Sequence, residues 1–366
     1  MRIVLVGAVL VLCPRAFALN PDLDVSQYAH TAWKIRDGFA KGRITAIAQT
    51  PDGYLWLGTE FGLLRFDGVR AVLWQPPLDQ HLSSSDIYSL LAARDGTLWI
   101  GTSKGLASWK DGKLTQYGEL AGFYIFRLLQ DHEGTVWAGA VGIPTGKLCA
   151  VRNGNAQCFE IEPGLRGVIL GLYEDSKGNL WVGVSTGLWR WKPGPPKFYS
   201  MPGEVDGIRA LAEDDDGELL IGRRGGIRRF VDGKIEPYPL SGPVSQFEAE
   251  KLLRDRDGGL WIGTDNRGLL HVHKGRTDVF AQSDGLSGED YALPFEDREA
   301  NIWVTTSDGL DRFRDFAVAT FTAKQGLSNN IVDSVIAARD GVVWTSTFGL
   351  NRMSSGQITT YDKREG

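Results

Sequence analysis

Short apolar segments alternate along the chain with turns rich in glycine and aspartate. The first unit of this pattern contains four such segments, at residues 44–49, 54–59, 62–66 and 69–74. Asp52-Gly53 and Asp67-Gly68, which separate two pairs of segments, are typical of tight hairpin turns. No stretch combines helical periodicity with capping residues, so the pattern predicts an all-β fold of antiparallel strands.

One signature, Asp-x-x-Gly-x-Leu-Trp-x-Gly-Thr followed by Gly-Leu, recurs eight times with substitutions. Its tryptophan position is occupied by Trp56, Trp99, Trp137, Trp181, Leu220, Trp261, Trp303 and Trp344. Successive copies lie about 41 residues apart, and a period near 40 with four strands per unit is the mark of a β-propeller. We expect the tryptophan to fill the space between blades and the following glycine to permit close backbone approach.

The number of blades depends on where the N-terminal strand around Trp33 pairs. We favour a seven-bladed ring over residues 19–317, in which this strand completes the blade of residues 302–313. Residues 318–366 then begin a second propeller. In the eight-bladed alternative, the N-terminal strand completes the blade of Trp344, and 318–366 hold the eighth blade.

The first 18 residues have the features of a secretory signal peptide. Arg2 gives a positive start, residues 3–12 are almost wholly apolar, and Ala16-Phe17-Ala18 is a small-x-small cleavage site. The apolar run is too short to span a membrane, which takes ~20 residues. We therefore expect cleavage after Ala18 and a periplasmic mature chain, tethered to a membrane only if the full protein continues.

Cys149 and Cys158 remain after that cleavage and flank the turn Asn153-Gly154. Both central positions of such a two-residue turn need positive φ, which asparagine and glycine tolerate. With that turn, the two cysteines face each other on neighbouring strands as a non-hydrogen-bonded pair, close enough for a disulfide. The sequence thus predicts a Cys149–Cys158 disulfide in an oxidising compartment.

The amino-acid composition excludes some classes of function for this chain. Glycine (46 of 366 residues) and tryptophan (12) are abundant, as turns and large packed side chains require, whereas the chain holds only 5 histidines. The formal net charge of −5 gives no general attraction to nucleic acid. No metal or cofactor is predicted, because His271 and His273 share one strand face without an evident third ligand.

Three copies of the signature, Leu55-Trp-Leu-Gly-Thr59, Leu98-Trp-Ile-Gly-Thr102 and Leu260-Trp-Ile-Gly-Thr264, resemble the regulator-propeller repeats of bacterial two-component sensors. Asp284-Gly-Leu-Ser287 and Gln325-Gly-Leu-Ser328 resemble the linkers of that family, and the likeness extends over about residues 30–361. The resemblance implies a periplasmic sensory input domain. It also implies that a transmembrane helix and an output domain, such as a histidine kinase, follow in the intact protein, so this chain itself would not be an enzyme.

Propellers bind ligands at one mouth of the ring, which is lined by the turns between second and third strands and by the connections from outer to inner strands. The residues predicted at this mouth are Glu60, Lys104, Tyr124, Arg223, Arg224, Asp265, Asn266, Arg267, Tyr291 and Asp308. Their charged and aromatic side chains suit a polar small molecule or an oligosaccharide. Arg223 and Arg224 could hold a carboxylate or sulfate, or could simply balance the acidic residues 213–216.

Two other classes stay open at this point. A secreted glycosidase or lyase would need a catalytic pair, for which Glu60, Asp265 and Asp308 are the candidate carboxylates. A scaffold that binds a protein partner, or forms a homodimer, would need no such chemistry. The scarcity of histidine favours binding over catalysis.

Overall fold

The computed structural model describes residues 19–20, 23–142, 146–160, 168–201, 207–242, 244, 246–315, 320–346, 349–354 and 357–361. The predicted signal peptide, residues 1–18, lies outside the described residues. Over the described ranges the strands form eight four-stranded antiparallel sheets. The predicted all-β fold of four-stranded antiparallel blades is therefore confirmed. None of the helices in these ranges is long and apolar enough to cross a membrane.

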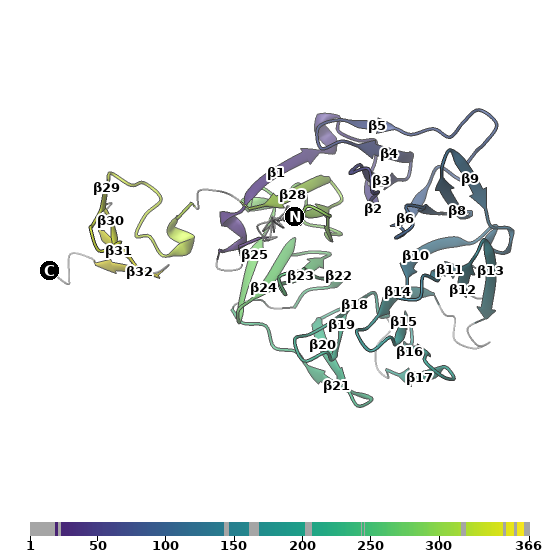
Figure 1. The fold of residues 1–366 in the computed structure, drawn as a ribbon. Coiled ribbons are helices and arrows are strands. Elements are labelled where there is room, and N and C mark those ends of the chain that lie inside the picture. Colours follow the sequence, from purple (N-terminus) through teal and green to yellow (C-terminus); the bar gives the residue numbers. More distant parts are fainter. Residues whose placement is uncertain are drawn as a thin grey trace, which may run out of the picture.

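Seven sheets follow one another around a central axis (Figure 1). The strands nearest the axis are β2 (Ile44–Gln49), β6 (Ile87–Ala92), β10 (Tyr124–Gln130), β14 (Ile169–Glu174), β18 (Ala210–Glu213), β22 (Ala249–Arg254) and β26 (Leu293–Glu296). The second strands carry the repeated signature and are β3 (Leu55–Thr59), β7 (Leu98–Thr102), β11 (Val136–Val141), β15 (Leu180–Val184), β19 (Leu219–Arg223), β23 (Leu260–Thr264) and β27 (Ile302–Thr305).

The third and outer strands complete each blade. The third strands are β4 (Gly62–Phe66), β8 (Gly105–Lys110), β12 (Lys147–Arg152), β16 (Gly187–Lys192), β20 (Gly226–Val231), β24 (Leu269–His273) and β28 (Gly309–Arg314). The outer strands are β5 (Ala71–Leu73), β9 (Lys113–Gln116), β13 (Asn155–Glu160), β17 (Lys197–Ser200), β21 (Lys234–Pro237), β25 (Arg276–Phe280) and β1 (Ala29–Lys34). Short 3-10 helices occur at η1 (Val25–Gln27), η2 (Ile35–Asp37), η3 (Gly118–Leu120), η4 (Gln282–Asp284) and η5 (Ala323–Gln325).

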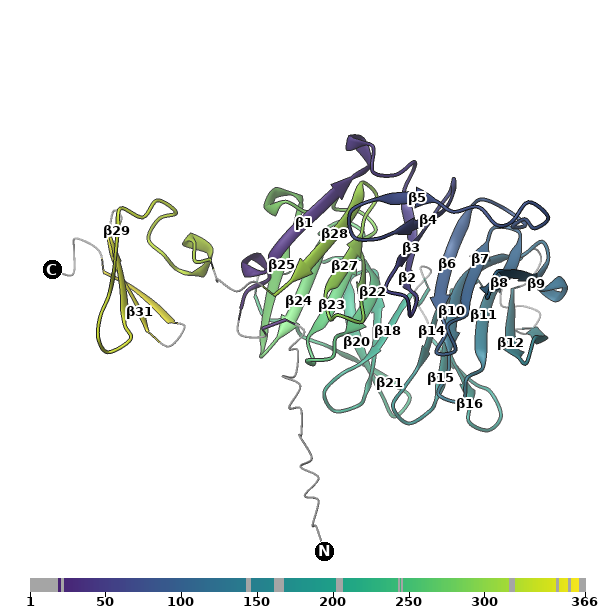
Figure 2. The ribbon, with the colours of Figure 1, turned by 45° about the horizontal axis from the view of Figure 1, so that its top comes forward.

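The N-terminal strand β1 pairs antiparallel with β28, with Trp33 opposite Leu310. It thereby completes the sheet of β26, β27 and β28, which is the pairing that the seven-bladed prediction requires. The eighth sheet, β29 (Ser334–Ala337), β30 (Val343–Ser346), β31 (Leu350–Ser354) and β32 (Gln357–Tyr361), pairs within itself and lies beside the ring (Figure 2). The total of eight sheets is the number in the eight-bladed alternative. That residues 318–366 begin a second propeller stays a prediction.

The signature tryptophans pack between blades, as predicted. Trp56, for example, lies in one buried cluster with Ile87 and Leu98 of the next blade. The glycine two residues later allows this approach, because a Cβ on Gly58 would lie 2.6 Å from the Cγ2 of Ile87. Blade contacts of this kind bury both faces of each sheet and hold the ring closed.

The aspartate of the signature anchors the tryptophan. The indole Nε1 of Trp137 donates to Oδ2 of Asp131 at 2.8 Å. The same bond joins three other pairs, Trp181–Asp175, Trp261–Asp255 and Trp303–Asp297, at 2.6–2.7 Å. Each buried indole N–H is therefore satisfied within its own blade.

The predicted disulfide is confirmed. Cys149 and Cys158 are direct cross-strand partners on β12 and β13, with Cα atoms 4.0 Å apart and sulfur atoms 2.06 Å apart. Asn153 and Gly154 form the turn, both with positive φ (50° and 79°), as the sequence required.

Candidate functional site

The predicted mouth residues lie at one end of the ring, on the turns after the second strands and on the connections that enter the inner strands. Two of the aromatic side chains there are open to solvent, Tyr124 (46% exposed) and Tyr291 (39%). Tyr124 and Arg223 lie at the mouth ends of the strands β10 and β19 themselves. Their role in binding a ligand is a separate question.

Tyr291 has an unusual backbone and a cationic neighbour. Its φ is +52°, a left-handed conformation that bulky side chains seldom adopt. The guanidinium carbon of Arg43, which precedes β2, lies 4.5 Å from the centre of the Tyr291 ring. Arg209 precedes β18. Burial lowers the pKa of its guanidinium, but the charge and hydrogen bond of Glu250 raise it overall, with smaller contributions from Glu248 and Tyr291. The sequence analysis missed both arginines.

Glu248 links two of the predicted residues. Its carboxylate Oε2 lies 3.9 Å from Nε of Arg224, and its backbone carbonyl accepts the N–H of Asp265 at 3.0 Å. Arg224 and Asp265 come from neighbouring blades, so Glu248, on the connection that enters β22, joins the two. The ion pair is exposed and contributes little stability, but it fixes charged groups of both signs at the mouth.

A second aromatic group lies across the mouth. The ring of Tyr88 on β6 is 5.7 Å from that of Tyr124 and 5.6 Å from that of Phe126, both on β10. Three aromatic side chains from two blades therefore make one continuous surface.

Other predicted residues are not brought together. Glu60, Lys104 and the adjacent pair Asn266 and Arg267 stand exposed on three separate turns. Asp308 lines a different hollow of about 350 Å³ with Lys34, Arg36 and Ser287, among others. Arg223 is half-buried at the end of β19. On the next strand, Arg229 pairs with Asp214 and Asp216. One arginine near Arg223 and Arg224 therefore does balance the acidic residues 213–216.

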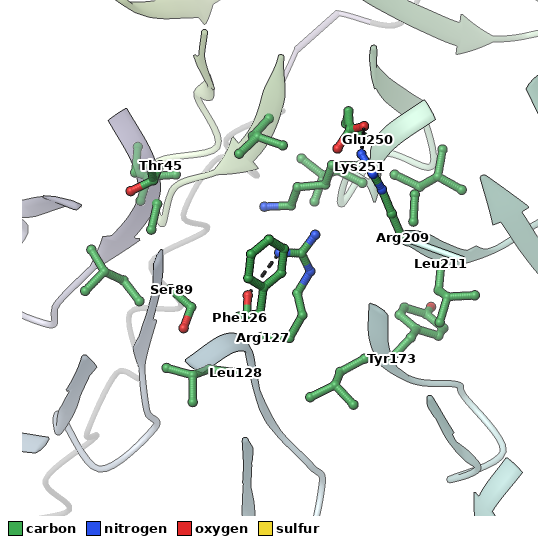
Figure 3. Close-up of a pocket in the computed structure, with 18 of the residues that line it drawn as sticks. Thr45, Ser89, Phe126, Arg127, Leu128, Tyr173, Arg209, Leu211, Glu250 and Lys251 are labelled. Carbon is green, nitrogen blue, oxygen red and sulfur yellow. Dashed lines mark hydrogen bonds and ion pairs between the residues drawn. The ribbon is translucent and has the colours of Figure 1, made fainter. Parts of the chain in front are cut away.

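Below the mouth, the inner strands enclose a central channel with a cavity of about 360 Å³. Figure 3 shows Arg127 and Lys251 reaching into it, with Glu250 beside Arg209. The Nη1 of Arg209 donates to Oε1 of Glu250 at 2.5 Å. The sequence analysis did not single out any of these four residues.

Burial and charge set the titration of the channel groups. Burial lowers the pKa of Lys251 to about 8, and the positive charge of Arg127 adds to that shift. Burial also lowers the pKa of Arg127, to about 10, with the charge of Glu250 opposing it and that of Arg209 contributing. Burial raises the pKa of Glu250, although its bond to Arg209 works in the other direction.

The structure adds a third side chain to the two histidines of β24. His271, His273 and Asp278 have potential ligand atoms within 4.8 Å of one another, and all three are buried. However, Nε2 of His273 already bonds to Oδ2 of Asp278 at 2.7 Å. The two imidazole rings are stacked, 4.4 Å apart and 14° from parallel, so their nitrogen lone pairs lie in parallel planes. A metal at 2.0–2.1 Å from both nitrogens fits that arrangement poorly, and we assign none.

The repeats match a known family. The family model described as the two component regulator propeller matches residues 38–61, 81–104, 164–186 and 249–266, each of which includes part of an inner or second strand. No curated protein matches the chain by sequence.

Solved structures share the fold. One is the extracellular domain of a protein from B. thetaiotaomicron described as the hybrid two component system BT3049, with 20% identity and a TM-score of 0.68 over 92% of this chain and 49% of that one. A second, described as the one component system BT4673 of the same organism, has 20% identity and a TM-score of 0.64 over 92% of this chain and 47% of that one. The chain thus spans about half the length of these extracellular domains.

An enzyme has the same architecture. Virginiamycin B lyase from Staphylococcus aureus is 12% identical, with a TM-score of 0.60 over 78% of this chain and 99% of that one. At such identities the likeness concerns the fold alone, whereas the matched repeats are specific in sequence. Within those four segments, the chain carries repeats that match the two component regulator propeller model.

Proposed function

We propose that this propeller is the periplasmic input domain of a bacterial signal-transduction protein and that it binds a polar ligand, such as a saccharide, at the mouth of the ring. The output would be produced by domains beyond this chain, after a transmembrane segment. The propeller itself would bind and not catalyse.

The observation that carries the proposal is the conformation of Tyr291. A left-handed backbone at a bulky residue costs of order 1–3 kcal/mol and persists only where surrounding contacts enforce it. Here it holds a half-exposed ring at the mouth, under Arg43. Strain of this kind concentrates at ligand-binding sites, and it supports a binding role for the Tyr291–Arg43 pair.

The composition of the mouth supports a ligand with both polar and apolar surfaces. A saccharide has hydroxyl groups and apolar C–H faces. Tyr291, Tyr124 and Tyr88 offer rings for the faces, and Arg43, Arg224 and Asp265 offer partners for the hydroxyls.

Two features support export. The predicted signal peptide directs the chain to the periplasm, and the Cys149–Cys158 disulfide is stable in an oxidising compartment. The similar B. thetaiotaomicron structures are described as extracellular domains, in line with this location.

The test is a thermal-shift screen of oligosaccharides against residues 19–366, followed by calorimetry on any that raise Tm. We expect Tyr291→Ala and Arg43→Gln each to weaken binding at least tenfold. The matched control is Tyr54→Ala, because Arg65 lies over the Tyr54 ring in the same way, at 3.4 Å, at the opposite end of the ring.

Turnover of a glycoside or a lyase substrate by the purified domain would contradict the proposal and favour an enzyme. Equal loss of binding in Tyr54→Ala and Tyr291→Ala would contradict the assignment to this mouth. Capture of a protein partner that Tyr291→Ala leaves intact would favour a scaffold instead.

A further inference from the structure

We propose that the central channel binds an oxyanion, such as a carboxylate, sulfate or phosphate group, between Arg127 and Lys251. This site lies below the mouth, on the inner strands, and does not depend on the ligand proposed for the mouth.

Comparison of the blades shows that these two cations are exceptional. Each blade has one residue on its inner strand that lies ten positions before the signature tryptophan or leucine. In chain order these residues are Ala46, Ser89, Arg127, Gly171, Ala210, Lys251 and Leu293. Five blades carry a small or aliphatic residue, so the repeat itself requires no charge there.

The local backbone is the same at both cations. Arg127 and Lys251 are the cross-strand partners of the signature glycines Gly139 and Gly263. Each follows a β-bulge, between Ile125 and Arg127 on β10 and between Ala249 and Lys251 on β22. The same bulge precedes Ala46, Ser89 and Gly171 in three other blades, so it belongs to the repeat and not to the cations. Here the two residues come from non-adjacent blades and reach the same cavity (Figure 3).

The carboxylate among the residues that line the cavity, that of Glu250, is already engaged with another cation. Glu250 pairs with Arg209, and Arg254 at the channel wall pairs with Asp215. Arg127 donates from Nη1 to the backbone carbonyl of Phe126 at 3.0 Å. For Lys251, the described residues provide no hydrogen bond or ion pair to Nζ. The cavity therefore has an excess of positive charge.

Two cations that face one cavity repel each other, and removal from bulk water adds to the cost. The lowered pKa of Lys251 reflects burial first and the charge of Arg127 second. An anion between the two side chains would offset their repulsion and the cost of their burial, because guanidinium and ammonium groups make their strongest hydrogen bonds to charged oxygens. A cavity of about 360 Å³ has room for such a group together with several waters, each of which takes ~30 Å³.

The chemistry of the cations restricts the ligand. The guanidinium of Arg127 retains donors suited to two oxygens of one planar or tetrahedral oxyanion, and the ammonium of Lys251 supplies a point charge. Chloride offers no pair of oxygens. Sulfate, phosphate and acetate are therefore the probes, with sodium chloride at equal ionic strength as the reference.

The experiment is a titration of residues 19–366 with each probe, by calorimetry and by Tm. We expect saturable binding of at least one oxyanion, and at least a tenfold loss of affinity in Arg127→Gln and in Lys251→Met. Matched controls are Arg70→Gln and Lys113→Met, which remove an exposed arginine just before β5 and an exposed lysine on β9, both on outer strands away from the channel, and should leave the affinity unchanged. Acetate binding without sulfate or phosphate binding would identify a carboxylate site, and the reverse would identify a tetrahedral oxyanion site.

A second variant keeps the test decisive if the first ones unfold. Lys251→Glu places a carboxylate in the channel beside Arg127, so the protein should fold with a Tm at or above that of the wild type in chloride and no longer respond to oxyanions. Absence of saturable binding in the wild type, or unchanged binding in the folded Lys251→Glu protein, would overturn the proposal. Neither outcome would affect the binding of saccharides at the mouth.

Discussion

The buried Oδ2 of Asp131 accepts hydrogen bonds from both the indole Nε1 of Trp137 and the ammonium of Lys192, each at 2.8 Å. Burial by itself would raise the pKa of Asp131, but the bonds from Lys192 and Trp137 lower it below its usual range. The carboxylate therefore remains charged in the fold and connects the third blade to the fourth.

Replacement of Asp131 by alanine should destabilise the domain by about 1–3 kcal/mol, because it leaves the indole N–H of Trp137 without its acceptor and removes the nearest of the three carboxylates around Lys192. Chemical denaturation measures the loss. Asp52→Ala is the control, since Asp52 is exposed and pairs with Arg65 at 3.2 Å, and it should cost less than about 0.5 kcal/mol. Equal costs for the two variants would contradict the anchoring role.

Close approach between the sixth and seventh blades predicts a steric effect at Gly263. A Cβ at this position would overlap the carbonyl oxygen of Ala292, so Gly263→Ala should cost at least about 2 kcal/mol through displaced backbone. Gly118 is an open position in η3 with nothing near its missing Cβ, and Gly118→Ala should change stability by less than about 0.5 kcal/mol. Thermal unfolding of both variants compares them directly, and a tolerated Gly263→Ala would mean that the blades are less closely packed here.

Acid sensitivity should come partly from His271. Its ring is stacked on Trp261 at 3.8 Å, and burial, with a contribution from the charge of His273, lowers its pKa to about 3. Below pH 6.5 this histidine binds a proton in the unfolded chain but not in the folded protein. The free energy of unfolding therefore falls as the pH drops from 6.5 towards 3. His271→Phe keeps an aromatic ring on Trp261 and removes the titration.

Between pH 7 and pH 5, His271→Phe should therefore lose less stability than the wild type by about 2 kcal/mol. Urea denaturation at each pH measures the difference. His81→Gln serves as the control, because it removes an exposed histidine that lies outside the Trp261 cluster. Parallel profiles for wild type and His271→Phe would show that the histidine is protonated in the fold.

The repeat made much of this fold predictable. The position of Trp33, the turn at Asn153-Gly154 and the mouth turns after each second strand all follow from local patterns that recur at a fixed phase. Arg43 and Glu248 were missed because the connections from outer to inner strands vary in length and carry no signature, so their side chains cannot be assigned to the mouth before the ring is built.

The channel was missed for a different reason. Arg127 and Lys251 lie within strands that are otherwise read from their apolar positions, and the bulge before each residue shifts which side chains face the axis. The two cations become evident when the residue ten positions before the signature tryptophan or leucine is compared in all seven blades, because five blades carry an uncharged residue there. In this propeller, that comparison therefore singles out Arg127 and Lys251 among the inner-strand residues.

The titration of Lys251 gives the channel a pH dependence that can be measured. Arg127 on β10 and Arg209 beside β18 stay largely charged at pH 9. Glu250 on β22 stays paired with Arg209. Burial raises the pKa of Tyr173 on β14 far above its usual range, so this tyrosine stays neutral. Lys251, with a pKa of about 8, is therefore the channel group that loses its charge between pH 7 and pH 9. Sulfate keeps its charge over this range, so a change in its affinity reports the protein.

Sulfate should bind about 10-fold more weakly at pH 9 than at pH 7, because only the fraction of molecules with a protonated Lys251 is competent to bind. Lys251→Arg, whose guanidinium stays protonated, should bind sulfate with nearly the same affinity at both values. Calorimetry at pH 7, 8 and 9 compares the two proteins. A wild-type affinity that is flat with pH would place the sulfate away from Lys251, whereas an equal decline in Lys251→Arg would assign the titration to another group.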